Sequence, residues 1–105
     1  MNTPLTELQH FLGGHFHQDW TEDHSSADEV IDSFLLESTR ETISIIREEI
    51  LKLISSHTNE LDLQHNLLHE QHCYYYYSNQ WSSARSWLNH IVIKFDKCLL
   101  DNKHP

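Results

Sequence analysis

Turn-forming residues are scarce in this sequence, and their scarcity constrains the fold more than any other feature. The chain of 105 residues contains only two Gly and two Pro. Sandwiches and barrels need turn residues at almost every strand end, so an all-β fold is disfavoured. Apolar residues instead recur at spacings of three and four, which is the pattern of amphipathic helices. We therefore predict an all-α domain spanning residues 1–105, with residues 101–105 frayed.

Five helical segments with short connections are expected. The first begins at Thr3–Pro4 and stops at Gly13–Gly14, because Pro is tolerated at a first helical position and Gly favours a left-handed cap. The later helices begin at a cap on Ser25 or Ser26, at a capping box over Ser38–Glu41, at Asn59, and at Ser82 or Ser83. The fourth of the five should end near Gln71. Only the tyrosine run favours a strand, and a single short strand has nothing to pair with.

The apolar stripes of these helices predict the core. The expected core residues are Ala27, Val30, Ile31, Phe34 and Leu35 in the second helix, Ile43, Ile46, Ile50, Leu53 and Ile54 in the third, Leu61, Leu63, Leu67 and Leu68 in the fourth, and Trp87, Leu88, Ile91, Val92, Phe95, Cys98 and Leu99 in the last. Cys73 and Cys98 are too few for a disulfide scaffold, and we interpret both as reduced packing thiols. No apolar run is long enough for a membrane span, and no signal peptide is visible. These features favour a cytoplasmic protein.

Negative charge is concentrated in the first third of the chain. The net charge is −9, and residues 1–37 hold eight of the sixteen acids but no Lys or Arg. Nucleic acid and membrane surfaces are therefore poor partners, because phosphate binding needs clustered basic residues. An acidic region suits a basic protein partner, while an acidic surface that serves only solubility is the simpler alternative.

Ten histidines raise the question of a metal site. His65, His69, His72 and Cys73 would share one face of a helix, and zinc uses such ligands. The zinc-protease pattern, in which a Glu supplies the general base, is missing, so a solvated polar face is the simpler interpretation. We expect neither a bound metal nor another cofactor.

Catalysis has little support in the sequence. His17 and Asp19 could imitate an acid–base pair, but no nucleophile in a suitable setting and no Gly-rich phosphate loop accompany them. We therefore predict that the protein is not an enzyme.

A ten-residue string after the first helix resembles a family of bacterial immunity proteins. Its residues are Phe11, Leu12, Gly13, Gly14, His15, Phe16, His17, Gln18, Asp19 and Trp20. With the acidic helix that follows, Ser25–Leu36, and with the pair Trp87–Leu88, it is similar to immunity proteins of contact-dependent growth inhibition systems. The resemblance is strong over the first half and weaker in the last helix. Residues 58–80 match nothing in that family.

The resemblance implies a small, all-α, non-enzymatic protein that binds the C-terminal toxin domain of its own strain's surface effector and blocks it. Such toxins are very often nucleases, commonly RNases, and a nuclease needs basic residues to hold its substrate. We therefore expect a basic toxin as partner in a 1:1 heterodimer. A general acidic adaptor or regulator of another basic protein is the alternative.

The predicted roles of individual residues divide into scaffold and contact. The string residues Gly13, Gly14, Phe16, His17, Gln18, Asp19 and Trp20 are predicted to be mainly structural, because a string shared by proteins that face different toxins is scaffold. Contacts with the toxin are predicted for acidic residues and for the tyrosine run, whose rings cannot all face a core. These residues are Asp19, Glu22, Asp23, Asp28, Glu29, Asp32, Tyr74, Tyr75, Tyr76 and Tyr77.

Overall fold

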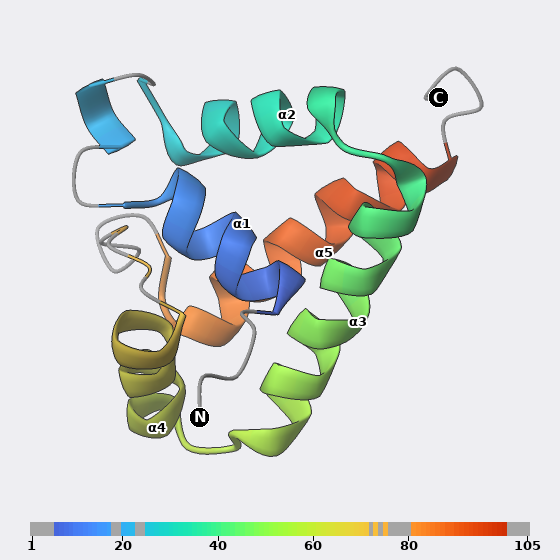
Figure 1. Cartoon of the computed structure of the whole chain (residues 1–105). Helices are drawn as coiled ribbons and strands as arrows, with labels where there is room; N and C mark the ends of the chain where they lie inside the picture. Colours follow the sequence, from blue (N-terminus) through green and yellow to red (C-terminus); the bar gives the residue numbers. More distant parts are fainter. Residues whose placement is uncertain are drawn as a thin grey trace, which may run out of the picture.

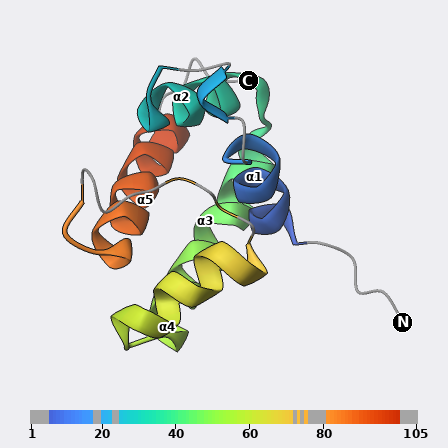
Figure 2. The same cartoon turned by 90° about the vertical axis from the view of Figure 1, so that its left-hand side faces the viewer.

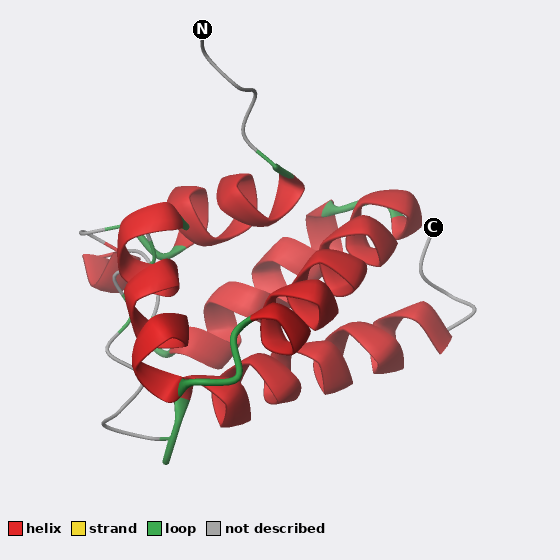
Figure 3. Ribbon diagram, turned by 90° about the horizontal axis from the view of Figure 1, so that it is seen from below, coloured by secondary structure: helices red, strands yellow, loops and turns green. Residues whose placement is uncertain are grey.

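Five α-helices surround a shared hydrophobic core in the computed structural model (Figure 1). The structure describes residues 6–17, 20–22, 25–71, 73, 75 and 81–100. The elements in chain order are α1 (Glu7–His15), η1 (Trp20–Glu22), α2 (Ala27–Glu37), α3 (Arg40–Ser56), α4 (Glu60–His65), η2 (Asn66–Glu70) and α5 (Ala84–Leu100). The described residues contain no strand (Figure 3), and the prediction of an all-α fold is confirmed.

The two longest helices, α3 and α5, pack against each other, and each of the other α-helices contacts one of them. Helix α1 contacts α2 and α3, helix α2 also contacts α5, and α4 contacts α5 from the opposite end of the molecule. Figures 1 and 2 both show α2 at one end and α4 at the other. No described helix combines the length and the apolar character that a membrane crossing requires.

Every residue of the predicted core stripes of α2 and α3 is buried. In α5, Trp87, Leu88, Ile91, Val92 and Phe95 are buried, while Cys98 and Leu99 pack against the core at its edge. The stripe predicted for the fourth helix is only half right. Leu63 and Leu67, four residues apart, are buried, but Leu61 and Leu68 lie on the solvent side of the same helix.

Both predicted ends of the first helix are wrong. Thr6 caps the helix: its side chain accepts the backbone N–H of Gln9, whose amide oxygen accepts the N–H of Thr6 in return. Thr3 and Pro4 lie outside the described residues. At the other end, α1 continues through Gly13 and Gly14 to His15. The packing of the His15 ring against Phe11 and Phe34, 6.0 and 5.1 Å between ring centroids, explains why the last turn persists despite two glycines.

The starts of the remaining helices agree more closely with the positions predicted from the sequence. Ser26 and Asn59 cap α2 and α4 as predicted. Thr39, rather than Ser38 in a box with Glu41, caps α3, because the Ser38 hydroxyl is engaged with the Phe34 carbonyl oxygen at the end of α2. At α5, Ser83 accepts the Ser86 N–H at 3.0 Å. The segment from Asn59 to Gln71 is helical as predicted, but its second half, η2, widens into a π-helix.

Candidate protein-binding surface

Helix α2 has an acidic outer face that is exposed to solvent and an apolar inner face that is buried in the core. Its start is fixed by the Ser26 side chain, which accepts the N–H of Glu29 at 3.1 Å. The Glu29 carboxylate in turn accepts the Ser25 hydroxyl at 2.7 Å. With the buried stripe turned inward, the exposed residues of the helix are Asp28, Glu29, Asp32, Leu36 and Glu37. The sequence-based placement of carboxylates on the solvent side of α2 agrees with this structure.

Two of these carboxylates form ion pairs with α5. Asp28 Oδ1 lies 2.9 Å from His90 Nε2, and Asp32 Oδ1 lies 2.8 Å from Lys94 Nζ. Both Asp side chains stay more than half exposed. The pairs hold α2 to α5 and fix the two carboxylates in position while leaving part of each open to solvent.

The sequence contained a signal for these pairs that was missed. Asp28 and Asp32 are four residues apart on one helix, and His90 and Lys94 are four apart on another. Residues at this spacing share a helix face, so two adjacent helices can form two successive pairs. The correspondence between these two pairs of residues becomes evident only when α2 is known to pack against α5.

A hollow of about 560 Å³ lies between α2 and α5 beside these ion pairs. Its lining residues are Asp32, Leu35, Leu36, His90, Ile93, Lys94, Lys97 and Cys98. Leu36 is 80% exposed and Ile93 is 53% exposed, each on the polar side of its helix. We call this hollow and its rim the α2–α5 groove. The two apolar residues interrupt the polar faces of their helices, which is a feature already present in the sequence.

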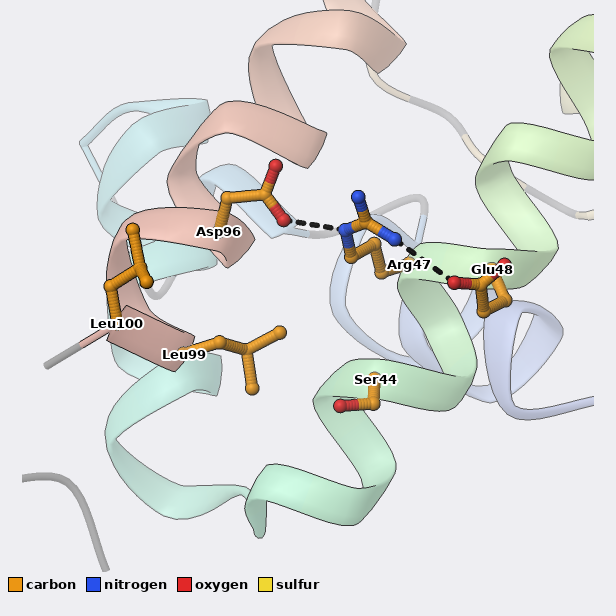
Figure 4. A pocket seen from close by; sticks show the side chains of 6 residues that line it. All are labelled: Ser44, Arg47, Glu48, Asp96, Leu99 and Leu100. Carbon is orange, nitrogen blue, oxygen red and sulfur yellow. Dashed lines mark hydrogen bonds and ion pairs between the residues drawn. The ribbon is translucent and has the colours of Figure 1, made fainter. Parts of the chain in front are cut away.

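A second hollow, of about 370 Å³, lies between α3 and α5 (Figure 4). Arg47 extends across it to Asp96 of α5, and its guanidinium also lies 2.9 Å from a Glu48 carboxylate oxygen. The hydrogen bond and negative charge of Asp96 are the main causes of the raised pKa of Arg47. Because the cation is already satisfied by two carboxylates, this hollow is a structural junction of the two long helices.

The Phe11–Trp20 string contributes several residues to the core. Phe16 is fully buried, and its ring meets Trp87 edge to face with centroids 5.4 Å apart. Trp20 and Tyr75 complete this aromatic cluster: their centroids lie 5.7 Å from that of Phe16. Tyr75 also packs against Trp87 at 4.8 Å. These positions support a structural role for Phe16 and Trp20.

The tyrosine run is represented by one described residue, Tyr75. Its ring is buried in the aromatic cluster, and this burial raises the pKa of its phenol. Tyr75 is therefore a core residue and not part of the exposed surface. Tyr74, Tyr76 and Tyr77 lie outside the described residues, as do Gln18, Asp19 and Asp23. Glu22 is exposed in η1, and His17 is half-buried next to Phe16.

The histidine face has only part of the predicted arrangement. The rings of His65 and His69 are tilted against each other, with centroids 4.3 Å apart, on the exposed side of α4 and η2. Cys73 is buried, and burial raises the pKa of its thiol to about 12, which disfavours the thiolate that binds metals. His72 is not among the described residues. Within the described part of the chain, no group of three or more candidate ligands comes together.

Residues 4–95 match the CdiI immunity protein family. A chain in the crystal structure of a CdiA-CT/CdiI complex from Y. kristensenii 33638 has 32% sequence identity and a TM-score of 0.80, with 85% of this chain and 95% of that chain covered. No curated protein sequence matches the chain.

The family match spans most of the chain and runs through residues 58–80, for which the sequence alone had offered no counterpart in the family. The chain therefore belongs to the CdiI immunity proteins. The resemblance found at the Phe11–Trp20 string is thereby confirmed, including its implication of an all-α fold.

Proposed function

We propose that this protein binds the C-terminal toxin domain of its cognate CdiA-type effector in the cytoplasm and neutralises it as a 1:1 complex. The observation that carries the proposal is the similarity over 85% of this chain to a chain of a CdiA-CT/CdiI complex. The protein acts by occupying the toxin, so it needs no turnover of its own.

We further propose that the toxin is a nuclease, with RNases favoured. The eight acids in residues 1–37 support this class of partner, because a nuclease presents Lys and Arg to the phosphates of its substrate. Carboxylates fixed on a protein surface can pair with the same basic residues. In the described part of the first third, these carboxylates lie on α1, η1 and α2.

A titration of the protein into a nuclease assay of the purified cognate toxin tests both proposals. Cleavage of RNA should stop near a 1:1 molar ratio, and longer incubation should change nothing. Inhibition at strongly substoichiometric ratios that deepens with time would mean that this protein modifies its target chemically. A toxin domain from a non-cognate effector is the control and should stay active.

A growth experiment distinguishes toxin immunity from the alternative function, that of a general acidic adaptor. Cells that produce the cognate toxin domain in their cytoplasm should survive only when this protein is also produced. An adaptor for another basic protein would give no protection. A toxin that binds this protein tightly but cleaves neither RNA nor DNA would retain the immunity function and overturn the nuclease assignment.

A further inference from the structure

We infer that the α2–α5 groove is the surface that receives the toxin, with Leu36 and Ile93 as its apolar centre and Asp32 of α2 on its acidic edge. This inference rests on the proposed function and adds the place and chemistry of the contact. The partner segment it fits carries an apolar side chain for the groove and basic residues that lie over α2.

The first support is the exposure of apolar groups at one place. Leu36 and Ile93 come from different helices, yet both line the groove while remaining 80% and 53% exposed. Protein interfaces commonly place such side chains at their centre, where contact removes them from water, and surround them with polar groups. The groove provides this arrangement, since Asp32, His90, Lys94 and Lys97 surround its apolar residues.

The second support is the distribution of charge around the groove. On the α2 side, Glu29 and Asp32 are exposed, and α2 itself contains no basic residue. On the α5 side, Lys94 is paired with Asp32, and Lys97 is exposed one turn further along. The groove lining therefore holds one carboxylate, Asp32 on its α2 edge, and two lysines at its α5 end. This uneven distribution means that charge complementarity fixes the direction in which a partner lies, with its basic residues over α2.

The third support is rigidity. The pairs Asp28–His90 and Asp32–Lys94 join the two walls of the groove, and the His90 ring also packs against Trp81 in a tilted arrangement with ring centroids 4.7 Å apart. A surface that is already ordered loses less conformational entropy on binding than a flexible one. The groove is therefore prepared for its partner before contact.

The test compares two pairs of exposed apolar residues. In the groove variant, Leu36→Asn and Ile93→Asn are combined. The control variant combines Leu61→Asn and Leu68→Asn on α4 and η2, which are 71% and 43% exposed, at the other end of the molecule. Asn adds no charge, so long-range attraction to the toxin is unchanged in both. Binding to the purified cognate toxin domain is measured by calorimetry, with the melting temperature of each variant recorded.

The groove variant should bind the toxin at least about 30-fold more weakly than the wild type, which is the range of interface hot spots. The control variant should stay within about threefold, as expected for positions outside the interface. Groove and control variants with equal affinity would overturn the inference, whereas a wild type that fails to bind the toxin would overturn the proposed function itself. Self-association that depends on Leu36 and Ile93, with unchanged toxin binding, would assign the groove to a second copy and also overturn the inference. Leu36→Asn alone serves if the double variant melts early.

Discussion

The aromatic cluster around Phe16 and the α2–α5 groove place large apolar side chains in opposite environments. In the cluster, Phe16 and Trp87 are fully excluded from solvent and contact each other edge to face. In the groove, Leu36 and Ile93 lie largely in water between charged residues. The aromatic residues of the Phe11–Trp20 string thus contribute to the interior, while α2, which also carries part of the family resemblance, supplies residues to the surface groove. A fold built in this way can keep its core and change its partner through surface residues.

The largest expected effect is on the cluster. Trp87→Ala should lower the free energy of unfolding by about 3–5 kcal/mol, because it leaves a cavity where a large buried ring was. Chemical denaturation with urea measures this loss. Leu36→Ala is the matched control and should change stability by less than about 0.5 kcal/mol, since its side chain is mostly in water already. Similar losses in both variants would remove the distinction between the two regions.

The cluster should also make stability depend on alkaline pH. Cys73 beside Tyr75 is buried, and its thiol pKa rises from 9.0 to about 12. Above pH 9 the unfolded chain releases this proton while the folded chain keeps it, so unfolding is favoured as pH rises. The contribution of this one group should reach about 1.4 kcal/mol per pH unit between pH 9 and 12. Urea denaturation of wild type and Cys73→Ala across this range should give a shallower slope for the variant; equal slopes would contradict burial of the thiol.

A substitution at Gly14 tests whether α1 continues through its glycines to His15. Gly14 lies within α1, and a Cβ built on it meets no atom within 4 Å. Gly14→Ala should therefore raise the free energy of unfolding by about 0.5–1 kcal/mol, the difference between the two residues in a helix interior. Thermal and urea denaturation measure the gain. A loss of stability would instead support a left-handed cap at this glycine, as the sequence alone suggested.

Loss of the Asp32–Lys94 ion pair of the groove should have only a small effect on stability. Asp32→Asn and Lys94→Gln each remove the same partly exposed pair, so both should cost less than about 1 kcal/mol. Their effects on association with the toxin should differ in sign. Loss of the carboxylate slows binding to a basic partner, and loss of the lysine accelerates it, by roughly two- to fivefold at low salt. Stopped-flow association rates measure the difference, and equal rates for both variants would place the charged contact elsewhere.

The sequence predicted most of the helices because their information is local. The stripes of α2 and α3 and the caps at Ser26 and Asn59 follow from spacing and side-chain chemistry within a few residues. The predicted end of α1 was wrong because His15 packs on Phe34 of another helix. Rules that consider only neighbouring residues in the sequence do not include such a contact. The same reason explains Leu61 and Leu68, whose exposure depends on which face of α4 meets the rest of the protein.

The candidate site was less predictable than the fold. Acidic residues on the outer face of α2 were expected from the sequence, but their pairing with His90 and Lys94 was not. The groove needs α2 and α5 side by side, and nearly fifty residues separate the end of one from the start of the other. Exposed apolar residues on polar helix faces, such as Leu36 and Ile93, are the signal that a sequence reading could have used.

Site-specific photo-crosslinking tests the central claim most directly. A p-benzoyl-L-phenylalanine placed at Leu36, in the groove, should form a covalent product with the cognate toxin domain on illumination, visible as one band at the summed mass of the two chains. The same residue placed at Leu61, which is nearly as exposed at the other end of the molecule, should give no such band. A product from Leu61 and none from Leu36 would contradict the assignment of the groove as the toxin-binding surface.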